Sequence, residues 1–111
     1  MSREPGSGVL GPLPPELMLA EAEELDPGST GSLRTIRGAH DCHAIVDDKD
    51  TDVAWAQQVA TSLSRKHPGR FYAFSAHPDY YWLVIAERGE TVYDDEGAVD
   101  GYARDLGCPI G

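Results

Sequence analysis

The pattern of apolar and polar positions is clearest between residues 70 and 88. Two runs rich in aromatic and β-branched residues flank the short segment His77-Pro78-Asp79. Proline cannot donate a ladder hydrogen bond and aspartate can bond its own backbone, so this spacing predicts an antiparallel hairpin. The second run, residues 81–86, shows almost no polar alternation, which is typical of an interior strand covered on both faces.

Helical periodicity is strongest in residues 53–67. Trp55, Val59 and Leu63 recur at i, i+4 and i+8, and two alanines join the same side. Acidic residues precede the segment, basic residues close it, and a proline–glycine pair follows, as expected for the two ends of a helix. The sequence therefore predicts a helix over residues 53–67.

A second amphipathic pattern follows residue 93 and predicts another helix. Its first residues, Asp94, Asp95 and Glu96, are typical of a helix start. Its apolar positions fall at i, i+3, i+4 and i+7. They are Val99, Tyr102, Ala103 and Leu106.

Three shorter runs, residues 33–37, 42–47 and 91–93, are predicted as strands, the first as an edge strand protected by its arginines. The predicted order is β-β-α-β-β-β-α. Residues 42–88 then form a split β-α-β unit, with the third strand inserted antiparallel between the first two and both helices on one face. The expected fold is α+β with a small antiparallel or mixed sheet. It resembles half of a ferredoxin-like plan, an architectural likeness that carries no function.

Residues 1–32 differ from the rest in composition, being rich in glycine, proline, serine and glutamate and free of aromatic residues. Such a segment buries too little apolar surface to offset chain entropy, so a flexible acidic arm is expected before a single domain at residues 33–111. Within the arm, residues 15–25 predict a short helix with an apolar stripe. A helix this short must lie against its own domain or in a partner's groove.

The net charge of −10 changes the range of expected partners. It argues against direct nucleic-acid binding and against anionic membranes, both of which select lysine and arginine. An acidic surface instead suits another protein with a basic surface. No export signal is visible and the two cysteines do not form a disulfide framework, so a cytoplasmic location is expected.

His40, Cys42 and His43 form the most chemically suggestive cluster. Structural zinc sites need two ligand pairs at characteristic spacing, and here the second pair is missing. Neighbours on a strand also face opposite sides, so neither a metal nor a cofactor is expected. No nucleophile, base and orienting group come together, and we expect no catalysis. The enzyme alternative is a metal-assisted hydrolase that uses His40 and His43 with the acidic run at residues 94–96.

These observations predict a small non-catalytic protein-binding factor, such as an inhibitor, an immunity-like protein or an accessory protein. Its acidic surface would meet a basic partner, and its aromatic and helical residues would supply apolar contact. The runner-up is a homodimer formed through the aromatic hairpin. The expected contact residues are Tyr80, Tyr81, Asp94, Asp95, Glu96, Leu17, Met18 and Leu25.

Overall fold

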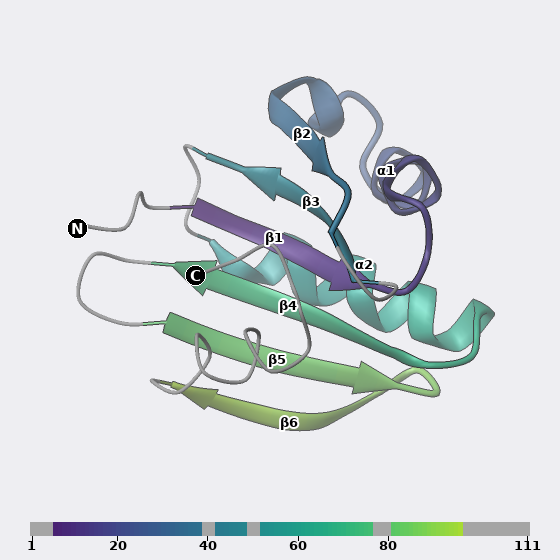
Figure 1. Ribbon diagram of the computed structural model, residues 1–111, viewed down its shortest axis with the longest axis vertical. Coiled ribbons are helices and arrows are strands. Elements are labelled where there is room, and N and C mark those ends of the chain that lie inside the picture. Colours follow the sequence, from purple (N-terminus) through teal and green to yellow (C-terminus); the bar gives the residue numbers. More distant parts are fainter. Residues whose placement is uncertain (1–5, 39–41, 49–51, 77–80, 97–111) are drawn as a thin grey trace.

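The computed structural model describes residues 6–38, 42–48, 52–76 and 81–96. These residues form a small α+β domain in which two helices pack on one face of a six-stranded antiparallel sheet (Figure 1). The strand order is β2-β3-β1-β4-β5-β6. The elements are β1 (Gly6–Gly11), α1 (Pro15–Leu25), the 3₁₀ turn η1 (Ser29–Ser32), β2 (Leu33–Ile36), β3 (His43–Asp47), α2 (Val53–Lys66), β4 (Arg70–Ala76), β5 (Tyr81–Glu87) and β6 (Glu90–Glu96).

Strand β1 lies in the interior of the sheet, between β3 and β4, and pairs antiparallel with both. Neighbouring strands lie so close to this strand that Gly8 and Gly11 leave no room for a side chain. A Cβ atom on Gly8 would lie 2.5 Å from the Ile45 carbonyl oxygen and 2.7 Å from the Phe74 ring, and one on Gly11 would lie 2.6 Å from the Phe71 ring. Glycine at these positions lets large side chains of β4 cover the strand.

The expectation of a flexible acidic arm does not hold for residues 6–32. Strand β1 is buried along its length, and helix α1 docks on the domain through Met18 and Ala22, which are 0% and 3% exposed. Composition predicted disorder because glycine contributes no apolar surface of its own. The missing surface is supplied by the aromatic side chains of the neighbouring strand. The bounds of α1 agree with the predicted helix near residues 15–25.

A split β-α-β unit is present, but its inserted strand differs from the predicted one. Strands β3 and β4 both run antiparallel to β1, so they are parallel to each other and are joined by α2. The inserted strand is therefore β1 and not the second strand of the hairpin. The hairpin itself is confirmed, since β4 pairs with β5 from Arg70–Glu87 to Ala76–Tyr81. Helix α2 and edge strand β2 are also confirmed.

Strand β6 corrects the prediction for residues 94–96. The backbone of Asp94, Asp95 and Glu96 continues β6 and pairs with β5, so these residues do not begin a helix. The turn before β6 places Arg88 and Gly89 at φ 55° and 80°. Two successive positive φ values are the hairpin geometry that matches the twist of a sheet. The rest of the second predicted helix lies outside the described residues.

The sheet buries apolar side chains on both faces. The helix-side core includes Val9, Met18, Ile45, Val59, Leu63, Phe71 and Val84. The second face carries Leu10, Cys42, Ala44, Val46, Phe74, Leu83 and Ile85, all at most 6% exposed. Both described helices lie on the first face. Neither of them is long and apolar enough to cross a membrane.

Candidate partner-binding site

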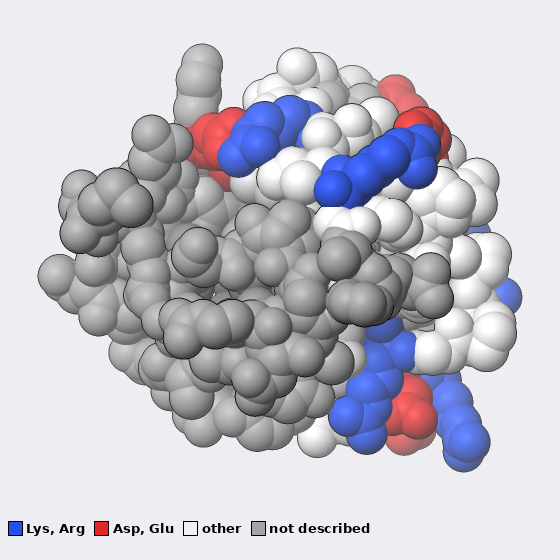
Figure 2. Space-filling model, in the orientation of Figure 1, with Lys and Arg blue, Asp and Glu red and all other residues white. Residues whose placement is uncertain are grey.

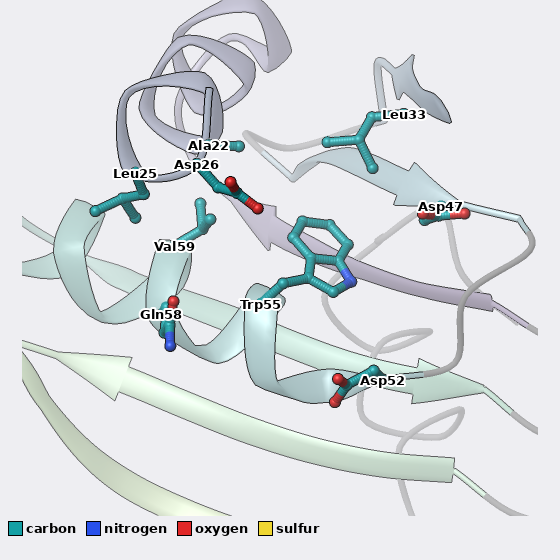
Figure 3. Close-up of a pocket in the computed structure, with 9 residues that line it drawn as sticks. All are labelled: Ala22, Leu25, Asp26, Leu33, Asp47, Asp52, Trp55, Gln58 and Val59. Carbon is teal, nitrogen blue, oxygen red and sulfur yellow. The ribbon is translucent and has the colours of Figure 1, made fainter. Parts of the chain in front are cut away.

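A hollow opens where the C-terminal end of α1 meets α2 and the edge of the sheet at β2 and β3 (Figure 3). Its volume is about 170 Å³. We call it the acidic hollow, because three of its lining residues are aspartates and none is basic. It is lined by Ala22, Leu25, Asp26, Leu33, Asp47, Asp52, Trp55, Gln58 and Val59.

Trp55, in the first turn of α2, supplies an aromatic surface of the hollow. Its Nε1–H donates a hydrogen bond of 2.8 Å to the hydroxyl of Ser7, which is fully buried in the interior strand β1. A buried indole N–H needs such a partner. The bond fixes the orientation of the ring, so that the hollow has a preformed aromatic side.

The three carboxylates come from three different elements. Asp26 caps the C-terminal end of α1, Asp47 ends β3, and Asp52 caps the N-terminus of α2 by accepting a hydrogen bond of 2.9 Å from the Ala54 N–H. Asp47 is only 9% exposed and accepts a bond of 3.1 Å from the Ser32 hydroxyl. Figure 3 shows the Asp26 carboxylate pointing toward the indole of Trp55. Clustered charge beside low-dielectric walls focuses a negative potential on the opening.

Apolar side chains complete the hollow and continue beyond it. Ala22 and Val59 are buried in the helix-side core, whereas Leu25 at the rim is 46% exposed. Leu17, also on α1, is 51% exposed. A more open groove of about 470 Å³ runs along α2 to Arg65; it shares Leu25 and Gln58 with the hollow, and the rest of its lining is mostly polar. The helical layer therefore presents apolar surface next to concentrated negative charge.

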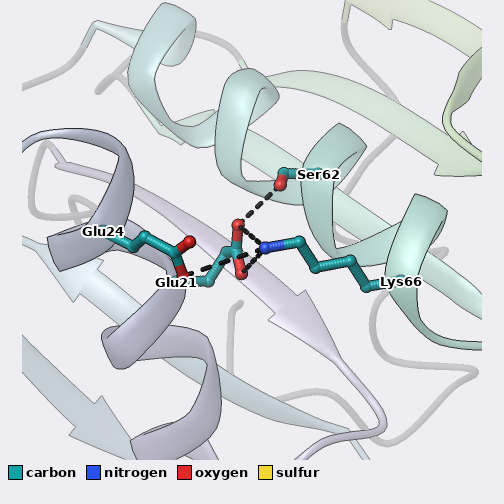
Figure 4. A network of polar contacts seen from close by, with 4 residues as sticks. All are labelled: Glu21, Glu24, Ser62 and Lys66. Atoms are coloured by element: carbon teal, nitrogen blue, oxygen red, sulfur yellow. Dashed lines mark hydrogen bonds and ion pairs between the residues drawn. The ribbon is translucent and has the colours of Figure 1, made fainter.

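Glu21 fastens α1 to α2 and thereby positions the hollow (Figure 4). Glu21 is 7% exposed, and its carboxylate accepts bonds of 2.6 Å from the Ser62 hydroxyl and 2.9 and 3.0 Å from Lys66 Nζ. Lys66 also lies 3.8 Å from Glu24. Burial raises the pKa of Glu21, but the hydrogen bonds from Ser62 and Lys66 outweigh it, so the pKa lies below its usual value. The ionised carboxylate therefore favours the docked position of α1.

Several basic side chains outside the hollow lie next to acidic ones, as the described part of the surface in Figure 2 illustrates. Arg34 makes two hydrogen bonds to Asp48, of 2.6 and 2.9 Å, which lower the pKa of that carboxyl. Ion pairs also join Arg37 to Glu16 and Arg70 to Glu87. Such exposed pairs contribute little to stability, but they neutralise charge locally. The acidic hollow differs from these surfaces in having no basic residue in its lining.

The structure separates the contact residues predicted from the sequence. Leu17 and Leu25 lie exposed on α1, whereas Met18 is fully buried and contacts a partner only if α1 leaves the domain. The backbone of residues 94–96 lies on β6, at the sheet edge opposite β2. The backbone of Tyr81 begins β5, and Tyr80 lies outside the described residues.

The described residues of the alternative hydrolase site, His43 and the acidic run at residues 94–96, lie on different strands of the sheet. His43 is half-buried at the start of β3, where its Nδ1 accepts a hydrogen bond of 3.3 Å from the Gly38 N–H. Three strands stand between β3 and β6, so His43 and the acidic run at residues 94–96 are roughly 19 Å apart at about 4.8 Å per strand. One ion cannot bind both. Cys42 is buried, and His40 lies outside the described residues. Within the described ranges, no three His, Cys, Asp or Glu residues gather to hold a metal.

Of the residues that line the hollow, the sequence indicated only Leu25 as a partner contact and treated the others as structural residues. Trp55 was assigned to the apolar face of a helix, and Asp52 belongs to the acidic residues that were expected to precede that helix. The one feature of the sequence that could have pointed to the hollow is the indole N–H of Trp55, because a half-buried tryptophan needs a hydrogen-bond acceptor nearby. No sequence pattern brings Asp26 and Asp47 together, because they meet only through the docking of α1 beside β3.

No protein family, curated protein or solved structure matches this chain. The acidic hollow is therefore interpreted from its own geometry and charge.

Proposed function

We propose that the protein acts without catalysis, by binding another protein that carries a basic surface, as an inhibitor, an immunity-like protein or an accessory factor. The observation that supports this proposal is the acidic hollow, in which three carboxylates surround an apolar floor and a fixed indole. The net charge of −10 has the sign required to attract such a partner.

A lysine or arginine side chain of the partner fits the chemistry of the hollow. Its aliphatic stem would lie against Val59 and Leu33, and its charged end would reach the carboxylates. A cation over the face of an indole gains further electrostatic attraction. The volume of about 170 Å³ is below the roughly 300 Å³ of small drug-like sites, so it suits one side chain better than a whole metabolite.

The surroundings of the hollow suit a protein–protein interface. Leu17 and Leu25 offer exposed apolar surface on the same helix that contributes Asp26. Interfaces commonly combine a desolvated anchor side chain with surrounding residues that exclude water but contribute little binding energy. Charge complementarity adds speed and selectivity of association more than affinity.

The test is capture of partners from an extract of the native host, at low and at high salt, followed by measurement of the affinity of the captured protein. Salt screens surface charges, so the binding of a partner through the hollow should be weaker at high salt. Asp26→Asn removes one charge from the hollow, and Glu90→Gln removes one exposed charge from β6 as a matched control. We expect Asp26→Asn to weaken binding at least tenfold and Glu90→Gln to leave it nearly unchanged.

Two results would contradict the proposal. Equal weakening by both variants would assign the interaction to the overall charge and not to the hollow. Recovery of only the protein itself, as a salt-insensitive dimer, would favour the homodimer predicted from the aromatic hairpin.

A further inference from the structure

The second face of the sheet is buried although both described helices lie on the other face. Phe74, Leu83 and Ile85 on this face are 2%, 4% and 4% exposed, and Ala44 is fully buried. An uncovered strand face would leave such side chains in contact with water. Among the described residues, no helix or strand lies over this face, so its cover must come from the remainder of the chain.

Only one part of the remaining chain is long enough to form that cover. The internal gaps are three or four residues each, and five residues precede β1, whereas fifteen residues follow β6. This C-terminal segment, residues 97–111, carries the apolar positions Val99, Tyr102 and Leu106 at helical spacing. An amphipathic segment that leaves the edge of a sheet can bury both its own apolar stripe and the sheet face.

Cys42 provides a second, independent observation. It lies on the second face, is 5% exposed, and is disulfide-bonded. The chain contains one other cysteine, Cys108, which belongs to the C-terminal segment. A sulfur buried to this extent cannot reach a second molecule without opening the domain, so the bond is expected within one chain.

The distances are compatible with this pairing. The paired register leads from Glu96 across the sheet to Asp47, roughly 19 Å, and five residues along β3 from Asp47 to Cys42 add about 17 Å at right angles. The diagonal is roughly 25 Å. Cys108 follows Glu96 by twelve residues, which span about 18 Å as a helix and up to roughly 40 Å when extended.

We propose that a disulfide between Cys42 and Cys108 holds residues 97–111 over the second face of the sheet. The bond forms when the two thiols exchange with a low-molecular-weight disulfide such as oxidised glutathione. One cysteine thiolate attacks oxidised glutathione, forms a mixed disulfide and releases one glutathione thiolate. The second cysteine thiolate then attacks the protein sulfur of the mixed disulfide and releases the other, so that two glutathione thiols carry away the two protons and two electrons. The cover keeps an apolar face of the sheet away from water and from other chains.

Mass spectrometry of the full-length chain, purified in air without reductant, tests the bond. After denaturation and alkylation with iodoacetamide, we expect no added label, and two labels only after prior reduction. Peptide mapping should recover the Cys42 and Cys108 peptides as one linked species that reductant separates. Two labels without reduction, or a disulfide-linked dimer, would overturn the proposal.

Thermal unfolding and dye binding test the cover. Reductant should lower the Tm of the wild-type chain by at least about 5 °C, because the cross-link restricts the unfolded chain. Cys108→Ser should show the same lowered Tm with or without reductant, which separates loss of the bond from other effects of reductant. The full-length Cys108→Ser chain should bind more of a fluorescent apolar dye than the oxidised wild-type chain does. Equal dye binding by the two chains, or a wild-type Tm that reductant leaves unchanged, would overturn the cover.

Discussion

Replacement of Gly8 by alanine is the sharpest test of how the interior strand β1 fits into the sheet. The added Cβ atom would lie 2.5 Å from the carbonyl oxygen of Ile45 and 2.7 Å from two atoms of the Phe74 ring. The ring is 2% exposed and the carbonyl belongs to β3, which is paired on both sides. Neither neighbour can move away without disturbing other contacts, so the strand itself has to shift.

The expected cost follows from two opposing effects. Forcing one methyl group into a filled core typically costs about 1–3 kcal/mol. Alanine also restricts the unfolded chain, which returns roughly 0.4–1 kcal/mol wherever the native backbone accepts it. At Gly8 the backbone contact is about 0.7 Å closer than a normal carbon–oxygen contact of about 3.2 Å, so the cost should lie at the upper end of its range. We expect Gly8→Ala to lower the free energy of unfolding by about 2 kcal/mol.

Urea unfolding followed by tryptophan fluorescence measures this change, and Gly31→Ala is the matched control. Gly31 is exposed and a Cβ atom there would meet nothing within 4 Å, so its substitution should be neutral or slightly stabilising. In the double variant Gly8→Ala/Phe74→Leu, the smaller side chain relieves the ring contact but not the contact with the Ile45 carbonyl. The double variant should therefore remain destabilised. If Gly8→Ala is as stable as Gly31→Ala, β1 is not packed in the interior of the sheet as described.

Three further predictions concern charge and the acidic hollow. Glu21→Gln should lower the free energy of unfolding by roughly 1–2 kcal/mol at pH 7, measured by urea unfolding, because the neutral amide cannot form the ion pair with Lys66 and has one acceptor oxygen in place of two. The folded-state pKa of Glu21 lies below 4.5, so its contribution should be present above pH 4.5 and vanish as the pH falls through that lower pKa; a variant with the same acid dependence as wild type would contradict this. Arg34→Gln should raise the pKa of Asp48 in an NMR titration while changing stability by less than about 1 kcal/mol, because the pair is exposed. Trp55→Phe should lower the free energy of unfolding by about 1–2 kcal/mol, measured by urea unfolding, and should weaken the binding of a basic partner. An unchanged stability would show that the hydrogen bond from the indole to Ser7 is dispensable.

The elements with strong periodicity could be predicted from the sequence. Helix α2 and the β4–β5 hairpin follow from the spacing of Trp55, Val59 and Leu63 and from the aromatic runs around Pro78. In these elements each side chain supplies its own apolar surface, so a local pattern is enough. The helix at residues 15–25 was found for the same reason.

Strand β1 could not be predicted, because the apolar surface that buries it belongs to side chains of the neighbouring strand and not to β1 itself. Gly8 and Gly11 leave space that Phe74 and Phe71 fill from β4, sixty or more residues away in the sequence. A local pattern records only the glycines, which also favour turns and disorder. The strand predicted at residues 91–93 is confirmed within β6, but its continuation through residues 94–96 was missed, since acidic residues suit a helix start as well as an edge strand.

The acidic hollow shows a similar limit. Asp52 was recognisable as one of the acidic residues before α2, and its role as the cap of that helix is confirmed, whereas Asp26 was not singled out before the structure placed it at the C-terminal end of α1. Their second role, as walls of one site with Asp47, depends on where α1 docks. Docking depends on contacts between residues about forty positions apart, such as the bond from Ser62 to Glu21. Sequence spacing gives no measure of such contacts.

Helix α1 connects the stability of the fold to the proposed binding surface, and the connection can be tested. Its inner side holds Met18 and Glu21 against the domain, whereas its C-terminal end presents Leu25 and Asp26 to the hollow and its rim. Leu25→Ser should therefore weaken the binding of a basic partner while changing the free energy of unfolding by less than about 0.5–1 kcal/mol, because Leu25 is 46% exposed. Glu21→Gln should weaken partner binding and also lower the free energy of unfolding, because it loosens the helix that carries the rim of the hollow. If α1 acted as a free arm that inserts into a partner, Met18 would instead form part of the interface, and Met18→Ser would reduce binding without reducing stability. Since Met18 is fully buried, we expect Met18→Ser to destabilise the domain by at least about 2 kcal/mol, measured by urea unfolding.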